Sequence, residues 1–384
     1  MNWYHKIVKL LAYDHFFIFR PFRHAVFLFL CFYNRILLFF IRCISLKSQE
    51  EVKRTQGNAG KYVFLSRNFN QSNISQVRNL VLNFQKVYSG KLIHIEKQGN
   101  TLFGNHRWVL NQIVLHKPSN LVIFDPQLLG LTGPIGLIRF YKLLKNLDLE
   151  GIRLHFIFFD LLDPQGVIFS SLASRLGIGT IFTGSTGDEA FEFFGILNST
   201  GPCLESMISN PSFVNYTNYR SIDLHLPRPS YEPRKSFVTR LVNDIESYNA
   251  NNRKKITYTV GGSFPNFESL QESLTRTKIV VVTNSIINGV IGRFPRPNGP
   301  LEHVVSYNAE ALAAGSLLFS QKCKALESVL VPDLEYVPFS LDDNLLTLLM
   351  YFLENERWQQ IAMKGNQKFF KLQQEQFLLK EQLL

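Results

Sequence analysis

The stretch LEHVVSYNAEALAAGSLLFSQ, Leu301 to Gln321, carries the clearest structural signal in this chain of 384 residues. It holds two carboxylates, Glu302 and Glu310, with seven residues between them. Ser306 is a candidate N-cap, and Gly315 suits the left-handed position just past a helix end. The apolar run after Gly315 is typical of a buried strand. The stretch therefore predicts a loop that carries Glu302, a short helix with Glu310 in its first turn, a tight stop and a strand.

The N-terminus of such a helix presents backbone N–H groups and the positive end of the helix dipole, which favour a diphosphate. In this position Glu310 can accept hydrogen bonds from the paired hydroxyls of a ribose. Glu302, in the preceding loop, can reach a sugar on the other side of the phosphates. A surface glutamate that opens an ordinary α/β helix is the alternative interpretation of Glu310.

The two glutamates belong to the pattern Glu-x7-Glu-Ala-x-Ala-x-Gly, which ends at Gly315. This pattern resembles the donor-sugar site of GT-B glycosyltransferases of the group 1 type, and more narrowly of their CgeB-like (spore maturation protein) branch. The resemblance implies that Glu310 binds the nucleotide ribose and Glu302 the transferred sugar. It also implies two Rossmann-like domains facing a cleft, of which the second holds a nucleotide-sugar and the first an acceptor.

The resemblance extends over residues 215–375, where the order of elements is similar to the second domain of CgeB-like enzymes. In that family the first strand of this domain usually ends in a glycine. Here the strand predicted at Ser221–Leu226 is followed by Pro227-Arg228-Pro229 instead. This departure bears on how closely the backbone approaches a donor at this loop.

Composition limits the classes of protein that the chain can represent. An apolar fraction of 46% excludes a disordered protein, and a net charge of +11 indicates an anionic partner. Nucleic acid is the weakest of the anionic candidates, because the chain carries no zinc-finger spacing and no RNA-binding signature. The four cysteines are scattered without pairing or metal-binding spacing, which fits a reducing, cytoplasmic compartment.

Residues 1–50 differ from the rest of the chain, because apolar runs alternate there with isolated arginines. Within Ala25–Ile41, Asn34 and Arg35 interrupt the longest apolar run, and a mid-span Arg costs roughly 2.5–3.5 kcal/mol in membrane insertion. We therefore expect a peripheral helix in the interface of an anionic membrane. A single transmembrane span and a hydrophobic helix packed on the catalytic body are the alternatives.

From Tyr62 onward, short apolar runs alternate with amphipathic helices, which predicts parallel sheets covered on both faces. We place a first Rossmann-like acceptor domain at residues 58–200 and a second, nucleotide-sugar domain at residues 215–384, whose terminal helices cross back. Polar residues after the strands face the ligand edge of such sheets. Among those of the first domain, Asp160 is the strongest candidate for a catalytic carboxylate that deprotonates an acceptor hydroxyl.

A long loop, Asn284 to Val305, separates the strand predicted at Lys278–Thr283 from the helix described above. Loops of this length are usually functional or disordered, and Arg293 and Arg296 within it are candidates for the diphosphate. Gly262 and Tyr307 complete the predicted donor-binding residues. No Asp-x-Asp metal motif stands out in a suitable loop, so we expect neither a metal nor a cofactor.

The sequence thus predicts a glycosyltransferase that moves a sugar from a nucleotide-sugar donor to a glycan, lipid or protein acceptor at the cytoplasmic face of a membrane. A nucleotide-sugar epimerase on the same fold is one alternative. A catalytically inactive scaffold of this fold, which binds a membrane or a partner, is the other. The patterns decide neither the donor base and sugar nor whether the transfer inverts or retains.

Overall fold

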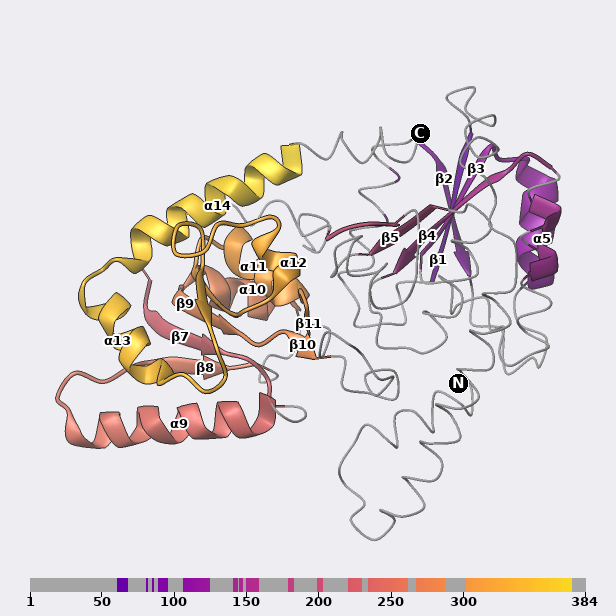
Figure 1. The fold of residues 1–384 in the computed structure, drawn as a ribbon. Coiled ribbons are helices and arrows are strands. Elements are labelled where there is room, and N and C mark those ends of the chain that lie inside the picture. The colour runs from indigo at the N-terminus through magenta and orange to yellow at the C-terminus, as the bar shows by residue number, and fades with distance from the viewer. Residues whose placement is uncertain are drawn as a thin grey trace, which may run out of the picture.

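The structure of this chain is a computed structural model, drawn as a ribbon in Figure 1. It describes residues 61–67, 81, 85, 89–95, 106–124, 141–143, 145–147, 150–158, 179–182, 199–202, 220–229, 234–261, 267–286 and 302–374, with 144 and some side chains within these ranges left out. Segment 1–50, predicted to associate with a membrane, lies outside the described residues. So do four of the predicted site residues, Asp160, Gly262, Arg293 and Arg296.

The first sheet has six parallel strands in the order β2-β1-β3-β4-β5-β6. The central strand β3 is buried along its whole length and apolar after Asn120, as is typical of a parallel strand with both faces covered. The helix α5 (His106–His116) precedes β3 along the chain. The strands are β1 (Tyr62–Arg67), β2 (Lys91–Ile95), β3 (Asn120–Phe124), β4 (Arg153–Phe158), β5 (Gly179–Phe182) and β6 (Ser199–Thr200).

The second sheet has five parallel strands in the order β13-β12-β9-β7-β8. Alternate strand residues point to two separate cores, so that Val280 and Val282 of β9 lie in one core and Ile279 and Val281 in the other. The strands are β7 (Ile222–Leu226), β8 (Tyr258–Val260), β9 (Thr277–Val282), β12 (Leu317–Gln321) and β13 (Val337–Phe339).

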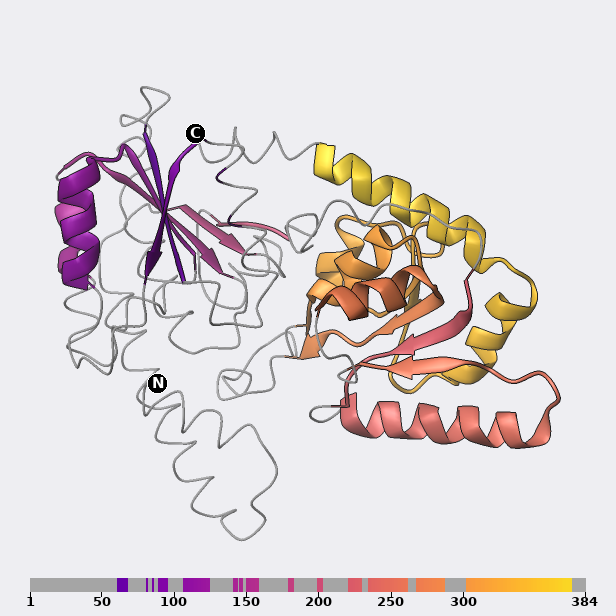
Figure 2. The same cartoon turned by 180° about the vertical axis from the view of Figure 1, so that it is seen from behind.

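Six helices cover the two faces of this second sheet. One core contains side chains of α9, α13 and the start of α14, and the other contains side chains of α10, α11, α12 and the later part of α14. Figure 2 shows α9 and α11 on opposite sides of the strands. The helices are α9 (Arg234–Asn251), α10 (Phe267–Thr275), α11 (Ser306–Ala313), α12 (Lys324–Glu327), α13 (Leu345–Glu354) and α14 (Trp358–Gln374).

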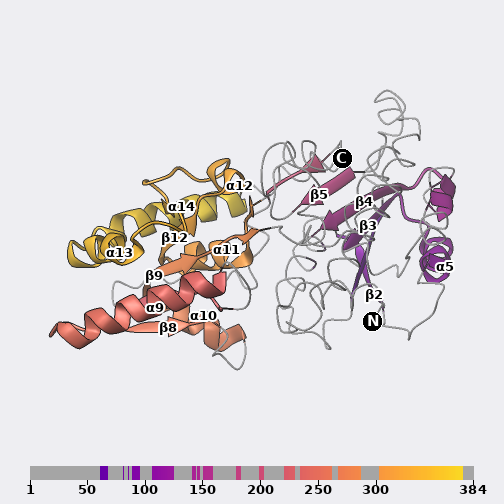
Figure 3. The ribbon, with the colours of Figure 1, turned by 60° about the horizontal axis from the view of Figure 1, so that its bottom comes forward.

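The two sheets share one strand order when their strands are numbered within each sheet. In both, the second strand lies at the edge, the first lies inside it, and the third lies on the far side of the first. The winding direction therefore reverses between β1 and β3 in one sheet and between β7 and β9 in the other. Ligands of such sheets bind at this reversal, outside the carboxyl ends of the strands. The predicted α/β class with two parallel sheets is confirmed (Figure 3).

The helix predicted from the opening stretch is α11, and it ends as predicted. Gly315 has φ of 67°, and its N–H donates to the carbonyl of Leu312 at 3.0 Å. The N–H of Ser316 donates to the carbonyl of Ala311, also at 3.0 Å. These two bonds form a Schellman motif, in which glycine takes the left-handed position without the strain that a Cβ would add.

The start of α11 corrects three details of the prediction. The N-cap is Val305 rather than Ser306, because the side chain of Asn308 accepts the N–H of Val305 at 3.0 Å and so caps the helix from inside. Glu310 consequently falls in the second turn. Glu302 belongs to a two-residue strand, β11 (Glu302–His303), which pairs with β10 (Ser285–Ile286) in an antiparallel ladder.

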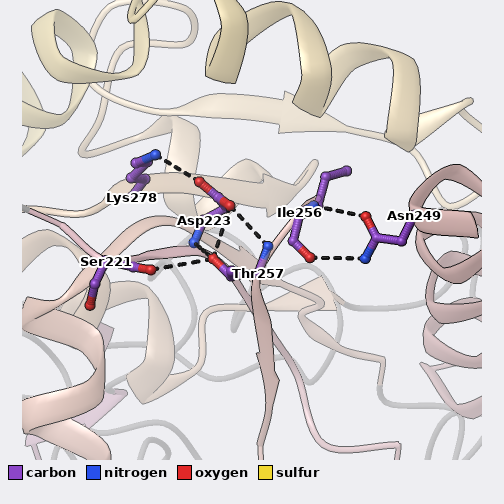
Figure 4. A network of polar contacts seen from close by, with 6 residues as sticks. All are labelled: Ser221, Asp223, Asn249, Ile256, Thr257 and Lys278. Carbon is purple, nitrogen blue, oxygen red and sulfur yellow. Dashed lines mark hydrogen bonds and ion pairs between the residues drawn. The ribbon is translucent and has the colours of Figure 1, made fainter. Parts of the chain in front are cut away.

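The amino-terminal edge of the second sheet is fastened by a polar network (Figure 4). The carboxylate of Asp223, on β7, accepts a hydrogen bond from the Nζ of Lys278 at 2.7 Å. It also accepts hydrogen bonds from the N–H and the hydroxyl of Thr257, both at 2.9 Å. Asn249, near the end of α9, bonds the N–H and the carbonyl of Ile256 with its own side chain at 2.8 and 3.0 Å. These contacts hold the starts of β7, β8 and β9 together.

Short elements escaped the sequence analysis. The strands β6, β10 and β11 have two residues each, and α12 has four, so none of them spans a period of its own. The closing segment, predicted as separate terminal helices, contains the single helix α14 up to Gln374. Within the part of the chain that the structure describes, none of the helices combines the length and the apolar character needed to cross a bilayer.

Candidate functional site at the carboxyl edge of the second sheet

The winding reversal between β7 and β9 singles out the carboxyl ends of these two strands. After β9 the chain continues with Thr283 and Asn284, both buried although both are polar. After β7 it continues with Pro227 and Arg228, of which only Pro227 is buried. Polar side chains that are buried at a ligand edge need partners, and these partners define the site.

Arg234 spans the reversal from the first residue of α9 to the end of β9. Its Nε donates to the hydroxyl of Thr283 at 2.6 Å, and its Nη2 donates to the Thr283 carbonyl at 2.8 Å. A cation in the first turn of a helix opposes the positive end of the helix dipole. The position of Arg234 is therefore poor for helix stability and favourable for an anion placed beside it.

Gly261, directly after β8, allows the loop after β7 to pass unusually close. Its N–H donates to the carbonyl of Leu226 at 2.8 Å, and a Cβ built on it would lie 2.9 Å from the backbone nitrogen of Arg228. Such contact with rigid backbone excludes any side chain at position 261. The glycine that the resemblance leads us to expect at the end of β7 is replaced by Pro227. Gly261, at the end of the neighbouring strand β8, packs closely against the backbone of the same loop.

His225, the penultimate residue of β7, is the buried residue beneath this edge of the sheet. It is fully buried, and its Nδ1 lies 2.9 Å from the hydroxyl of Thr259 on β8. Burial lowers the pKa of His225 to about 4, so its imidazole is neutral at physiological pH. The ring of Tyr307 stacks on it, with centroids 5.8 Å apart and planes 12° apart.

Tyr307, in the first turn of α11, contacts His225 and is influenced by three charged residues. Burial and then the negative charge of Glu310 raise the pKa of Tyr307 to about 12, while the charges of Arg234 and Arg228 act in the opposite direction. The hydroxyl of Tyr307 is therefore protonated at physiological pH and able to donate a hydrogen bond. The contacts of Arg234 with Thr283 and of Tyr307 with His225, together with Arg228 two residues after β7, bring these three residues to the same edge of the sheet.

A second pair of contacts fixes α11 and the strand ends relative to each other. The Nδ2 of Asn308 donates to the hydroxyl of Ser320 on β12 at 2.8 Å. The Nδ2 of Asn284 donates to the carbonyl of Gln321 at 2.6 Å. Because Asn308 also caps α11, the helix start, β12 and the end of β9 form one hydrogen-bonded unit.

Together these groups form an anion-binding arrangement. The N-termini of α9 and α11 converge on the carboxyl edge of the sheet, and Arg234 and Arg228 add two positive charges there. Glu310, only 2% exposed, provides a carboxylate behind this edge that can accept hydrogen bonds. Cationic, donor and acceptor groups side by side suit a ligand that carries phosphates and hydroxyl groups.

Of the seven predicted site residues, the structure describes the side chains of two. Glu310 and Tyr307 lie together at the start of α11. The backbone of Glu302 pairs with Ile286, and its side chain lies outside the described part of the structure, as do Asp160, Gly262, Arg293 and Arg296. No group of three or more metal-binding side chains occurs among the residues that the structure describes. That no metal takes part stays a prediction.

The sequence analysis missed most of the supporting residues. His225, Thr259, Asn284, Asn308 and Ser320 were not singled out, and the sequence favoured Arg293 and Arg296 over Arg234 as the residues for the diphosphate. A usable signal exists for several of them, since they are polar residues at the ends of otherwise apolar strands. For Asn308 the signal is its position three residues after the N-cap, where a side chain can bond back to the N-cap N–H.

Comparison with known proteins supports the fold. No protein-family model matches the chain, and no curated protein does. Sucrose-phosphate synthase from Thermosynechococcus elongatus superposes with a TM-score of 0.50 at 9% sequence identity, over 84% of this chain and 99% of that one. A glycosyltransferase from Rickettsia africae gives a TM-score of 0.48 at 9% identity, again over 84% and 99% of the two chains.

Anabaena HepE, solved in complex with UDP-glucose, gives a TM-score of 0.46 at 11% identity over 84% of this chain and 99% of that chain. At 9% sequence identity, the superposition on sucrose-phosphate synthase concerns the fold alone. The chain has the two-sheet α/β fold of GT-B glycosyltransferases, which the superposition on sucrose-phosphate synthase shows best.

Proposed function

We propose that this protein is a glycosyltransferase that transfers a sugar from a nucleotide-sugar donor bound at the carboxyl edge of the second sheet. The observation that carries the proposal is the position of Arg234, which starts α9 and is tied to the end of β9 at the winding reversal. With α11 and Arg228 it forms a site for a diphosphate on a fold shared with glycosyltransferases.

Within this proposal the two glutamates have separate roles. Glu310 accepts hydrogen bonds from the ribose, and Glu302 contacts the transferred sugar. Arg234 and Arg228 bind the diphosphate, together with Arg293 or Arg296 and the backbone at Gly262, so that no metal is needed. Asp160, in the first domain, is the candidate base for an acceptor hydroxyl. The acceptor is a glycan, lipid or protein held by the first domain.

The finer assignment to a CgeB-like branch rests on the pattern from Glu302 to Gly315 and belongs to the same proposal. So does association with the cytoplasmic face of an anionic membrane through residues 1–50, whose apolar runs and arginines support it. The domain boundaries at residues 58–200 and 215–384 remain predictions as well. They agree with strands of the first sheet at 62–200 and of the second at 222–339.

A matched pair of variants tests the proposal. Glu310→Gln should weaken the affinity for free nucleotide and for nucleotide-sugar alike, because both contain the ribose. Glu302→Gln should leave the affinity for free nucleotide unchanged and lower kcat, because sugar contacts that strengthen in the transition state act on turnover. A thermal-shift panel of UDP-, GDP-, ADP- and CMP-sugars first selects the nucleotide.

The burial of Glu310 makes this test sharper. If Glu310 only supports the packing of α11, Glu310→Gln will change the free energy of unfolding and leave nucleotide affinity as it was. If neither variant affects binding or transfer while the protein stays folded, the inactive scaffold becomes the better description. An epimerase would convert the nucleotide-sugar without an acceptor, which chromatography of the recovered nucleotide-sugar detects.

A further inference from the structure

The outer face of the first domain exposes two large apolar side chains next to each other. Val114 and Leu115, in the last turn of α5, are 71% and 70% exposed, more than any other large hydrophobic residue among those described. In all three ribbon views α5 lies on the side of this domain that faces away from the second sheet (Figure 2). The second domain therefore does not cover these side chains.

Lysines surround this end of α5. The carbonyl of Lys61 accepts the N–H groups of Ser119 and Asn120 at 3.0 and 3.2 Å, which places Lys61 beside the segment that follows α5. Lys91 starts β2 and pairs in register with Val63, two residues after Lys61. The side chains of Lys61 and Lys91 are both exposed.

Lys117 completes the group of cations directly after the helix. Its N–H donates to the carbonyl of Ile113 at 2.7 Å, its φ is 41°, and its side chain is exposed. The pKa of His116 is lowered by desolvation first and then by the charges of Lys91 and Lys61, so these lysines act on the end of α5. Three lysines and two apolar side chains thus share one edge, which we term the basic-apolar face.

Other charges at this edge do not cancel the lysines. The N–H of Arg153, at the start of β4, donates to the carbonyl of Ser119 at 2.9 Å, which adds another cation near the face. Glu150, exposed and three residues before Arg153, is the acidic residue of this edge among those described. The described charges of the edge are therefore predominantly positive.

We propose that the basic-apolar face docks on an anionic membrane surface. Apolar side chains flanked by lysines match an interface in which acyl chains lie beneath negatively charged headgroups. Nucleic acid would bind the lysines but would gain nothing from an exposed valine and leucine. This inference concerns the folded first domain and does not depend on the proposed glycosyl transfer.

The proposed membrane association of residues 1–50 would bring this face to the same surface. Lys61 follows residues 1–50, whose apolar and basic composition favours an interface, after the ten residues 51–60. Ten extended residues span at most about 35 Å, so a segment that lies on a membrane keeps Lys61 within that distance of the surface. The face also lies at the amino-terminal edge of the first sheet, opposite the strand ends where ligands bind. Docking would leave that ligand edge open.

The test uses the full-length protein with vesicles of phosphatidylcholine alone or mixed with phosphatidylglycerol. Hydrogen exchange of residues 112–117 reports on the face directly, whatever residues 1–50 contribute to binding. We expect these amides to exchange more slowly with the anionic vesicles and to be unaffected by the neutral ones. Unchanged exchange with the anionic vesicles would overturn the proposal. The same result is expected if residues 1–60, rather than a membrane, cover Val114 and Leu115.

Variants add a quantitative check by vesicle sedimentation. Lys91→Gln combined with Lys117→Asn, which tolerates the left-handed backbone, should weaken anionic-vesicle binding about 25-fold, since one lysine contributes roughly fivefold. Val114→Ser combined with Leu115→Ser should weaken it as well. The matched controls in the second domain are Lys254→Gln with Lys255→Gln and Val331→Ser with Leu334→Ser, all at exposed positions. Equal losses in test and control variants would contradict a specific face.

Discussion

Two arginines at opposite edges of the second sheet show how one residue type serves stability at one place and a ligand at another. Arg220, at the amino-terminal edge, is 5% exposed and donates to the carbonyls of Thr277 and Ala314 at 2.7 and 2.8 Å. Arg234, at the carboxyl edge, is half-buried and donates to the hydroxyl and the carbonyl of the single residue Thr283.

The helix dipoles account for the difference. Arg220 lies where α10 and α11 end, and it also donates to Leu274 at 3.3 Å and to the hydroxyl of Ser316 at 3.1 Å. Its guanidinium lies 5.9 Å from the ring centre of Trp358, so that α14 is held as well. A cation is favoured at helix C-termini and disfavoured at N-termini, where Arg234 lies. Arg220 therefore stabilises the fold, whereas the position of Arg234 becomes favourable when an anion binds beside it.

The largest effect should come from breaking the amino-terminal edge. Arg220→Met removes a donor from the buried Ala314 carbonyl and leaves the single hydroxyl of Ser316 to serve the carbonyls of Leu274 and Thr277. Each carbonyl that becomes unsatisfied costs about 1–3 kcal/mol. We expect the free energy of unfolding in urea at pH 7 to fall by about 3–5 kcal/mol.

Arg276→Met is the matched control, since Arg276 is exposed and its side chain makes a long hydrogen bond of 3.4 Å to the hydroxyl of Ser221 at the same edge. It should cost about 0.5 kcal/mol or less, as surface substitutions usually do. A loss of similar size in both variants would contradict the structural role given to Arg220.

The second effect should appear in binding rather than in stability. Arg234→Gln should weaken a nucleoside diphosphate by about 1.5–3 kcal/mol in titration calorimetry, the range of a hydrogen bond to a charged group. The corresponding monophosphate should lose less. Arg240→Gln, six residues further along the same helix, removes the same charge away from the helix start and should leave both affinities unchanged. An unaltered diphosphate affinity in Arg234→Gln would move the phosphate site to Arg293 or Arg296.

The smallest effect concerns Asp223. Burial alone would raise the pKa of Asp223, but the hydrogen bonds from Lys278 and Thr257 outweigh it and lower this pKa below 3.8. A carboxyl with a lowered folded-state pKa stabilises the fold above its unfolded-state pKa, and this stabilisation is lost as the pH falls through the folded-state pKa.

Asp223→Asn should therefore reduce the free energy of unfolding by about 1 kcal/mol at pH 7, because the ion pair with Lys278 is partly exposed. The difference from the unaltered protein should shrink as the pH falls below about 4. Urea titrations across this range measure it. A difference that stays constant with pH would show that the charge of Asp223 does not contribute.

Much of the architecture followed from local patterns. The alternation of apolar runs and amphipathic helices predicted two parallel sheets, and the stretch up to Gly315 predicted a short helix that stops at a glycine before a buried strand. These features can be predicted because side-chain periodicity and the tolerance of glycine for the left-handed region act over a few neighbouring residues. Glu310 and Tyr307 were predicted as site residues for the same reason, as members of one continuous stretch, and their roles remain predictions.

The tertiary structure alone decided the order of the strands and the partners of the polar residues. Arg234 and Thr283 are 49 positions apart, and His225 and Tyr307 meet only because β7 lies inside its sheet beside β9. No local pattern distinguishes Arg220 from Arg234, since each is a single arginine beside a strand or helix. What separates them is the end of the helices that each one meets, and only the packing of helices on the sheet determines that.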